Sequence, residues 1–393
     1  MFSFLSTKAA RGTGITIALV GLVSLLATST STLASPVAKP NVNVDAIAET
    51  KLQRGDQLVF GSSSSSSRIE SDIDVEPQLD LLDNNEDEIH HEAIVYGHIN
   101  RTLPSGREYV LKVPEGYVHG VQHPVVLSFH GAGGNSSRQE ILSQLSLPDL
   151  RIAGLPFLSA FPQGVNNTDW NMTHIWQAAV YGNKTVDDIQ FVKDILSDIS
   201  SKYTVNPRRY YASGKSNGGG FTALLACRPD TSALFAAFAP VSPALYQEAK
   251  AFHDCHPARG RAVPIFHSHG IEDDDTPFHG RTKESNWIYG PEPDVRDWRA
   301  RWALRNGHPA PPEGGLPKPN KVYHPHINAT EEVWDLGKAE IRALSVRGLG
   351  HSWPTTEGLD LAGRPNQTAT FNFTGEHLVQ FFSRHQLPEE FLP

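Results

Sequence analysis

The block 208–227 limits the possible folds of this chain more than any other segment. It starts with "RRYYASG", an apolar run typical of a buried strand, and ends with "GGGFTALLAC", an apolar run typical of a helix. Between them, positions 214–218 spell G-K-S-N-G, a G-x-S-x-G pattern. A strand that turns sharply into a helix at this pattern presents the Ser216 hydroxyl at the helix N-terminus, above a sheet. The block therefore predicts an α/β protein with a nucleophile elbow at Ser216.

The letters Gly214-Lys215-Ser216 are also those that end a phosphate-binding loop of the form G-x-x-x-x-G-K-S. That loop requires a glycine at position 209, because successive N–H groups of a glycine-rich run wrap the phosphates. Arg209 occupies this position, and the residues that follow it are typical of a strand rather than a loop. We therefore favour the nucleophile elbow over a nucleotide-binding site.

From about residue 93 onward, short apolar runs alternate with helical patterns. The runs "PVVLSFHG", "LPFLSAFPQG", "AVPIFHSHG" and "EIRALSVRG" each predict a strand followed by a turn. The segment 187–203 carries apolar residues at helical spacing: Ile189, Val192, Ile195, Leu196 and Ile199. Strands that alternate with helices predict a mostly parallel sheet with helices on both faces.

A serine nucleophile requires a histidine base and a carboxylate that orients the base. On an open α/β sheet the carboxylate and then the histidine follow the serine, each after a strand. The stretch "HGIEDDDTPFHG" supplies Glu272, Asp273, Asp274 and Asp275 after one predicted strand, and His351 follows another in "GLGHSWP". The spacing predicts His351 as the base and leaves the choice among the four carboxylates open.

Three other histidines lie near this acidic run. We interpret His267, His269 and His279 as core or surface residues, and because no third ligand accompanies the H-S-H pair, no metal site is expected.

An oxyanion hole on such a sheet uses two backbone N–H groups. One belongs to the residue after the nucleophile, Asn217, and the other to the loop "SFHGAGGNSS", in which we predict Ala132 as the donor. We expect His130 to brace this loop.

Residues 1–34 have the pattern of a secretory signal peptide. Lys8 and Arg11 form a positive start, an apolar core follows from Ile15 to Ala27, and Ala34 is a small residue at the cleavage point. The core is shorter than the roughly 20 residues that span a bilayer, which favours a cleaved peptide over an anchor.

Residues 35–92 are rich in serine and acidic residues and are expected to be disordered, as a pro-segment, spacer or solvated tail. The catalytic domain is then predicted to cover 93–393.

Export is also indicated by the glycosylation signals and the cysteines. Eight N-x-S/T sequons follow the predicted cleavage point, at Asn100, Asn135, Asn166, Asn171, Asn183, Asn328, Asn366 and Asn372. The only two cysteines, Cys227 and Cys255, are expected to pair in an oxidising compartment; two buried free thiols are the alternative. The net charge of −9 and the lack of a basic stripe argue against nucleic acid. We expect an extracellular monomer, free of the membrane once the signal peptide is removed.

With these motifs the chain resembles the secreted fungal feruloyl esterases of type C. These belong to the larger group of polyhydroxybutyrate-depolymerase-like and acetylxylan-type carbohydrate esterases. The matching stretches run through 95–385 in family order: "LSFHGAGG", "FPQG", "IWQAAVY", "VDDIQFV", "NPRRYYASGKSNGGGFTALLAC", "FAAFAPVSPALY", "HGIEDDDTPFHG", "RDWRARWALRNG" and "GLGHSWP". The resemblance implies an α/β-hydrolase fold.

Carried over to this sequence, the resemblance implies Ser216 as nucleophile and His351 as base. The family pattern HG-x-x-D selects Asp273 as the acid. It also implies a disulfide between Cys227 and Cys255 that ties the helix after the elbow to the segment before the acid strand.

The chain departs from the family pattern beside the acid. Ile271 and Glu272 replace small residues, and Phe278 replaces a common tyrosine.

The implied activity is hydrolysis of feruloyl esters of plant cell-wall polysaccharide, or of small esters, through an acyl-enzyme without cofactor or metal. An aromatic slot for the acyl group is expected from Trp176, Phe278 and Trp353, with Gln177 as a polar contact; ordinary core packing is the alternative for these rings. Acetylated xylan and polyhydroxyalkanoate are alternative substrates. A catalytically inactive, secreted binding protein is the alternative from a different class.

Overall fold

The computed structural model describes residues 96–246, 255–285, 288–335, 337, 339–360 and 366–392 of the 393-residue chain. These residues belong to one compact unit, Asp87–Pro393. The predicted signal peptide, 1–34, and the serine-rich and acidic segment, 35–92, lie outside the described residues. None of the described helices combines the length and the apolar character that crossing a membrane requires.

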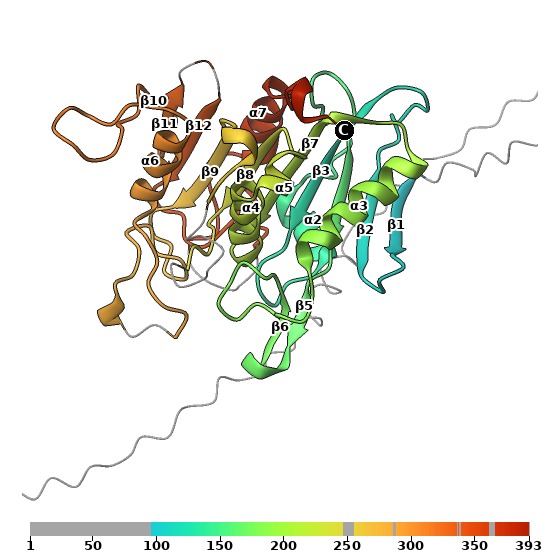
Figure 1. The fold of residues 1–393 in the computed structure, drawn as a ribbon, viewed down its shortest axis with the longest axis horizontal. Helices are drawn as coiled ribbons and strands as arrows, with labels where there is room; N and C mark the ends of the chain where they lie inside the picture. Colours follow the sequence, from blue (N-terminus) through green and yellow to red (C-terminus); the bar gives the residue numbers. More distant parts are fainter. Residues whose placement is uncertain are drawn as a thin grey trace, which may run out of the picture. The chain divides into compact units, whose positions relative to one another are not determined.

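The centre of this unit is a ten-stranded sheet in the order β1-β2-β4-β3-β7-β8-β9-β12-β11-β10 (Figure 1). Its strands are β1 (Gly97–Thr102), β2 (Glu108–Val113), β3 (His123–Phe129), β4 (Leu158–Pro162), β7 (Val205–Lys215), β8 (Ala237–Val241), β9 (Ile265–Gly270), β10 (Lys321–His326), β11 (Ala329–Asp335) and β12 (Glu340–Val346). The strands from β4 to β12 are parallel, whereas β1, β2, β11 and β10 pair antiparallel at the two sides. A separate hairpin is formed by β5 (Val165–Asn167) and β6 (Met172–Ile175). The mostly parallel sheet confirms the predicted fold class.

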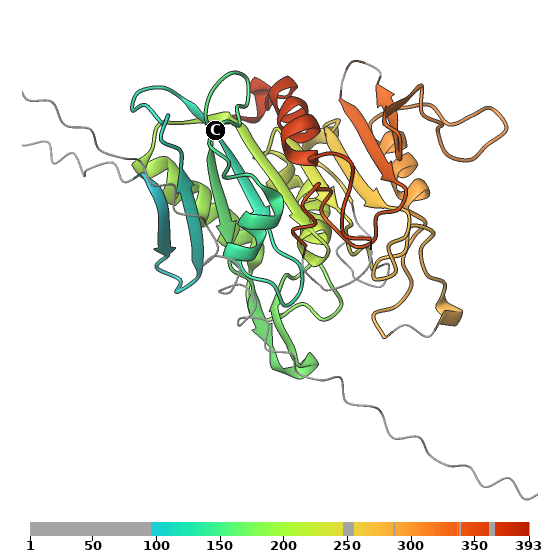
Figure 2. The ribbon, with the colours of Figure 1, turned by 180° about the vertical axis from the view of Figure 1, so that it is seen from behind.

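Helices cover both faces of the sheet. The α-helices are α2 (Ser136–Ser143), α3 (Asp188–Lys202), α4 (Asn217–Cys227), α5 (Pro229–Ser232), α6 (Val295–Arg305) and α7 (Val379–Arg384). Shorter turns are η1 (Thr168–Trp170), η3 (Ala258–Gly260), η4 (Lys283–Ser285), η6 (Glu389–Phe391) and the π-helical η5 (Thr374–Leu378). Helices α3, α4 and α6 lie in front of the sheet in Figure 1, and α2 and α7 lie on the other side in Figure 2.

Alternation along the central strands explains the two layers. In β3, Val125 and Leu127 belong to one buried cluster with the apolar residues of α3, α4 and α6, while Val126 belongs to a second cluster with those of α2 and α7. Successive side chains of a strand point to opposite faces, so a strand that is apolar at every position must be covered twice. Every residue of β3 is buried, as the continuous run "PVVLSF" predicts.

Helix α3 begins and ends as its sequence predicts. The Asp187 side chain accepts hydrogen bonds from the N–H groups of Ile189 and Gln190, which satisfies donors that the first turn leaves free. Lys202 occupies the last turn, where a positive charge interacts favourably with the helix dipole.

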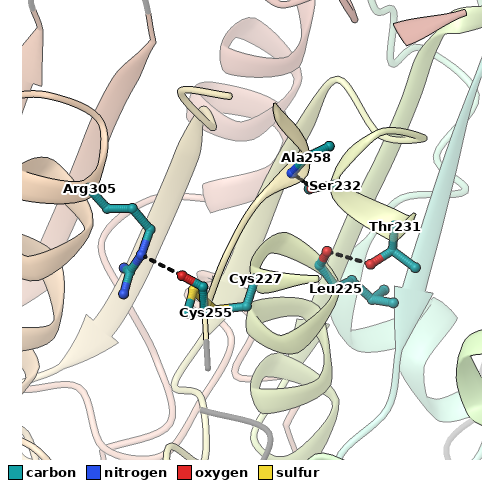
Figure 3. Close-up of a disulfide and its surroundings, with 7 residues drawn as sticks. All are labelled: Leu225, Cys227, Thr231, Ser232, Cys255, Ala258 and Arg305. Atoms are coloured by element: carbon teal, nitrogen blue, oxygen red, sulfur yellow. Dashed lines mark hydrogen bonds between the residues drawn. A yellow bond between two sulfur atoms is a disulfide. The ribbon is translucent and has the colours of Figure 1, made fainter. Parts of the chain in front are cut away.

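A disulfide joins Cys227, the last residue of α4, to Cys255, as predicted. In Figure 3 the bond fastens α4 to the segment that leads toward β9, and Arg305 of α6 donates a hydrogen bond to the Cys255 carbonyl at 3.3 Å. Ala258 N donates to Ser232 Oγ at 2.8 Å in the same region. The crosslink therefore lies between elements that carry the proposed nucleophile and the proposed acid.

Candidate active site

Ser216 lies between the end of β7 and the start of α4, with φ 56° and ψ −120°. A positive φ is costly for a residue with a Cβ and persists only where the surroundings enforce it. Two glycines provide the space for this turn. A Cβ on Gly214 would lie 2.4 Å from the Gly218 carbonyl oxygen, and a Cβ on Gly218 would lie 2.2 Å from the Phe129 carbonyl oxygen. The G-x-S-x-G spacing thus reflects the close approach of β7, α4 and β3.

Hydrogen bonds fix the elbow to the loop after β8. Ser216 N donates to Val241 O at 3.0 Å, and Ala244 N donates to Ser216 O at 2.9 Å. Asn217 is the first residue of α4, and an N–H in the first turn has no partner within its helix. The Ser216 side chain is consequently attached at the positive end of α4.

The carboxylate and the histidine meet at the ends of two neighbouring strands. Strands β9 and β12 pair in parallel, with Gly270 opposite Val346, so the loops that follow them leave the sheet at the same edge. His351 Nδ1 lies 2.8 Å from Asp273 Oδ2, and both residues are buried. Because a carboxylate only accepts, His351 Nδ1 carries the proton, which leaves its Nε2 lone pair free to act as a base.

Asp273 is distinguished from its acidic neighbours by burial and by hydrogen bonds. Of the four carboxylates, only Asp273 is buried, and its Oδ1 accepts from the N–H groups of Asp275 and Thr276 at 3.0 and 2.9 Å. Burial by itself raises the pKa of Asp273, but His351 and the hydrogen bonds from His269 and His351 outweigh it and hold that pKa well below its usual value. Asp274 is exposed, and Glu272 accepts from Gly348 N at 2.6 Å.

A buried chain of polar groups lies behind Asp273. Arg299 Nε donates to His267 Nδ1 at 2.9 Å, and His267 Nε2 lies 3.3 Å from His269 Nδ1. His269 Nε2 in turn lies 2.7 Å from Thr276 O and 3.3 Å from Asp273 Oδ2. Since a guanidinium only donates, the direction of every bond follows: His267 accepts at Nδ1 and donates from Nε2, and His269 does the same.

These two histidines were interpreted from sequence as core or surface residues. They are core residues, at 0 and 1% exposure, but they also hold Asp273. No sequence signal separates this role from simple packing, because Arg299 comes from α6 and reaches His267 only through the fold. His279, the third of the group, is exposed.

A short series of contacts connects the Ser216 elbow to the Asp273–His351 pair. Thr276 Oγ1 lies 3.0 Å from Asp273 Oδ2 and 3.3 Å from Ser242 O, and Ser242 follows Val241, the residue bonded to Ser216 N. In the described part of the chain no hydrogen bond joins Ser216 Oγ to the His351 ring. Such bonds are often long in ligand-free enzymes and tighten when substrate binds. The common edge, given by the adjacent parallel strands β7, β8, β9 and β12, brings the three loops together.

The predicted oxyanion loop follows β3, which pairs with β7. A Cβ on Gly131 would lie 3.2 Å from Ser216 Cβ, so this loop packs directly on Ser216. Ala132 is exposed beside it, and Asn217 is buried at the helix start. The loop is held by His130, whose Nε2 accepts from Gly164 N at 3.0 Å.

The other contacts of His130 show how the brace is built. Its Nδ1 lies 2.8 Å from Gly131 O, and its carbonyl accepts from Trp176 Nε1 at 2.8 Å. Burial lowers the pKa of His130 to about 4, so the ring is neutral and keeps Nε2 as an acceptor.

The aromatic residues predicted to contact the acyl group are buried. Trp176 and Trp353 are both 0% exposed, and Trp353 Nε1 donates to Thr374 Oγ1 at 3.1 Å. Phe278 packs edge-on against His269. Side chains that are only 0 to 6% exposed do not line an open slot, so the burial favours the alternative interpretation, core packing.

Gln177 instead borders an open cavity. This cavity has a volume of about 970 Å³, and its lining includes Trp170, Gln177, Asn183 and Tyr289. Trp176, the residue before Gln177, is bonded to the elbow, since its N–H donates to Asn217 Oδ1 at 2.7 Å. Sequence reasoning missed Trp170 and Tyr289, which lie in segments without a motif.

No family model matches this chain. Feruloyl esterase B of Piromyces equi is 25% identical over 253 residues, which are 63% of this chain and 42% of that protein. The bifunctional acetylxylan esterase/xylanase XynS20E of Neocallimastix patriciarum is 30% identical over 235 residues, 58% of this chain and 29% of that protein. Feruloyl esterase C of Emericella nidulans is 27% identical over 186 residues, 46% of this chain and 60% of that protein.

These relatives confirm the resemblance to feruloyl and acetylxylan esterases. The aligned part spans 42 to 62% of the length of the first three relatives. Among solved structures, an acetyl xylan esterase from Aspergillus awamori is 15% identical, with a TM-score of 0.42, over 65% of this chain and 94% of that one.

Proposed function

We propose that this chain is a secreted serine esterase that hydrolyses feruloyl esters of plant cell-wall polysaccharide. The observation that carries the proposal is the strained Ser216 elbow at the same sheet edge as the Asp273–His351 hydrogen bond. The names of the relatives support an ester substrate. Catalysis by this machinery needs no cofactor.

In the proposed reaction, Ser216 Oγ attacks the ester carbonyl carbon while His351 Nε2 takes the hydroxyl proton. Asp273 keeps the imidazole oriented and stabilises its charged form. The N–H groups of Asn217 and Ala132 hold the oxyanion. His351 then gives the proton to the leaving sugar oxygen, and the carbonyl re-forms as the acyl-enzyme.

Water completes the cycle. His351 takes a proton from water, the hydroxide attacks the acyl carbon, and the bond to Ser216 breaks with return of the proton to its oxygen. The products are the carboxylic acid and the free enzyme.

We also propose that the cavity bordered by Gln177 receives the aromatic acyl group. Its volume is within the usual range for small-molecule sites, about 300–1,000 Å³. Trp170 and Tyr289 lie with ring centroids 6.2 Å apart and give it aromatic character. Gln177 and Asn183 also line it and give it polar character.

Export, glycosylation and domain limits are part of the proposal. The predicted signal peptide directs the chain outside the cell, where the Cys227–Cys255 disulfide is stable. Five of the eight sequon asparagines are exposed: Asn100, Asn135, Asn166, Asn171 and Asn366. We propose these as the glycosylated positions, and 93–393 as a monomeric catalytic domain.

The test is release of ferulic acid from methyl ferulate by the secreted protein, with Ser216→Ala as control. The variant is expected to lose several orders of magnitude in kcat, on the order of 10⁶-fold for a serine nucleophile. Labelling of Ser216 by a fluorophosphonate is a second readout that is independent of the acyl group. Hydrolysis that survives in the variant, or a Ser216 that resists the label, would overturn the serine mechanism.

A second candidate substrate is acetylated xylan, favoured by the 30% identical relative with that name. Release of acetate from acetylated xylan, with no release of ferulate and with Ser216 labelled, would select it. A variant Trp170→Ala separates the two, because loss of the ring should raise KM for methyl ferulate and leave the acetyl ester unchanged. Hydrolysis of polyhydroxyalkanoate film tests the remaining ester alternative in the same way.

A further inference from the structure

Two histidines and a glutamate converge at the antiparallel side of the sheet. His326 ends β10, and Glu376 and His377 lie in η5, which precedes α7. One ligand atom from each of the three residues lies within 4.8 Å of the other two. His326 Nε2 is 2.8 Å from His377 Nε2 and 3.8 Å from Glu376 Oε2. Segments about fifty residues apart thus present two imidazole nitrogens and a carboxylate oxygen to one point.

The short distance between the nitrogens defines their state. Two imidazoles whose Nε2 atoms face each other at 2.8 Å share one proton, since one must donate and the other accept. A metal dication can take the place of that proton and bind both lone pairs. With Zn–N bonds of about 2.0–2.1 Å and tetrahedral angles, the two nitrogens would be about 3.3 Å apart. The rings need to separate by only about half an ångström to reach this geometry.

The ligands are held in place by their neighbours. The His326 ring stacks on Phe371, with centroids 4.1 Å apart and an interplanar angle of 7°. The His377 ring meets Phe371 edge-on at 5.3 Å. Glu376 Oε1 accepts from Asn372 N at 2.7 Å, so this bond orients the carboxylate whose Oε2 faces His326. Fixed orientation of this kind is what outer contacts provide in metal sites.

The backbone that carries two of the ligands is unusual. Residues Thr374–Leu378 form a single π-helical turn at the start of α7. Such turns are rare and occur frequently at functional sites. Here the π-helical turn carries the adjacent residues Glu376 and His377, and the ligand atoms of both approach His326.

We propose that His326, Glu376 and His377 form a binding site for a divalent transition metal of the zinc class. Imidazole nitrogen with one carboxylate suits Zn²⁺, Cu²⁺ or Ni²⁺, whereas Mg²⁺ and Ca²⁺ prefer oxygen ligands throughout. Water completes the coordination, because the three groups are partly open to solvent. The metal fastens the β10–β11 hairpin at the edge of the sheet to the segment that leads into α7. It takes no part in the proposed ester hydrolysis.

The experiment treats the purified full chain with a chelator, removes the chelator and then titrates the chain with Zn²⁺ in a calorimeter. The expected result is one saturable site per chain. His326→Ala and His377→Ala should each weaken binding by about tenfold or more, and Glu376→Gln should weaken it less. His324→Ala is the matched control, because His324 is exposed on the same strand two residues earlier and lies outside the cluster.

Thermal unfolding gives a second readout. At a Zn²⁺ concentration about 100 times Kd, the Tm of the wild-type chain should rise by roughly 5 °C, and the His326→Ala chain should not respond. His326→Gln keeps a hydrogen-bonding group and serves if the alanine variant is poorly folded. Equal Zn²⁺ binding by the wild type and the double variant of both histidines would overturn the site. Loss of binding in the His324→Ala control alone would do the same.

Discussion

The two halves of the candidate site are built in different ways. The nucleophile half is local: ten or so consecutive residues form the end of β7, the Ser216 turn and the start of α4. The acid–histidine half is assembled from distant segments, since Asp273 and His351 are 78 residues apart and Arg299 comes from α6. Backbone sterics hold the first half, and buried polar contacts hold the second. The two halves should therefore fail differently when they are altered.

After loss of the Ser216 hydroxyl itself, the largest expected effect is on the acid. Asp273→Asn should lower kcat by about 10⁴-fold, because an amide favours the wrong tautomer of His351. The exposed neighbour Asp274 gives the matched control, and Asp274→Asn should leave kcat nearly unchanged. Steady-state kinetics on methyl ferulate measure both. Equal losses in the two variants would mean that the acidic run acts as a whole and that Asp273 has no special role.

The nucleophile half should be most sensitive to substitutions that crowd its closely packed backbone. Gly218→Ala places a Cβ 2.2 Å from the Phe129 carbonyl oxygen, and neither backbone can move without disturbing β3 or α4. We expect a loss of about 3 kcal/mol or more in the free energy of unfolding. Gly375→Ala is the control, since its Cβ would meet only Leu150 Cδ2 at 3.8 Å. Urea denaturation compares them, and a stable Gly218→Ala chain would contradict the steric account.

Near the acid–histidine half, a buried carboxyl group should make the free energy of unfolding depend on pH. Burial raises the pKa of Glu292, which pairs with Arg281 near the acid loop, from 4.5 to about 7. The folded chain then holds this proton more tightly than the unfolded chain. The stability that Glu292 contributes is full below pH 4.5 and is lost as the pH rises to about 7. The loss amounts to at most about 3 kcal/mol.

Glu292→Gln should remove this part of the pH profile when the free energy of unfolding is measured from pH 4.5 to 8. Glu340→Gln serves as the control, because the pKa of Glu340 is shifted in the opposite direction. Salt bridges and hydrogen bonds outweigh burial there and lower this pKa to about 2. Its contribution is lost as the pH falls toward that value, and it does not change near pH 7. An unaltered profile in Glu292→Gln would contradict the prediction.

The smallest effect is expected for the buried polar residues behind Asp273, namely Arg299, His267 and His269. His269→Gln should lower kcat by about 10- to 100-fold through misplacement of Asp273, with little change in KM. His279→Gln, on an exposed histidine of the same segment, should change neither constant. If KM rises while kcat stays constant, His269 contributes to binding or to general packing rather than to the orientation of Asp273.

The comparison also explains how far the sequence could be interpreted. The apolar runs and the G-x-S-x-G spacing predicted the parallel sheet and the elbow, because these depend on residues close together in the chain. Spacing left the choice of the acid open among the four consecutive carboxylates 272–275. The family resemblance selected Asp273, the one that the fold buries against His351. The interpretation of Trp176 as a wall of the acyl slot is not supported by its position, since its side chain is fully buried and its ring packs against Phe129 and Phe221.

Sequence alone determined the strand–turn–helix block around Ser216, since a turn with positive φ between packed backbones admits only small residues on either side. It also determined that the two cysteines were available to pair. Only the tertiary structure decided which residues meet Asp273, how Arg299 sets the hydrogen-bond direction of two histidines, and that His326 faces His377. These contacts join residues tens of positions apart, and their geometry depends on the strand order and on the packing of the whole sheet.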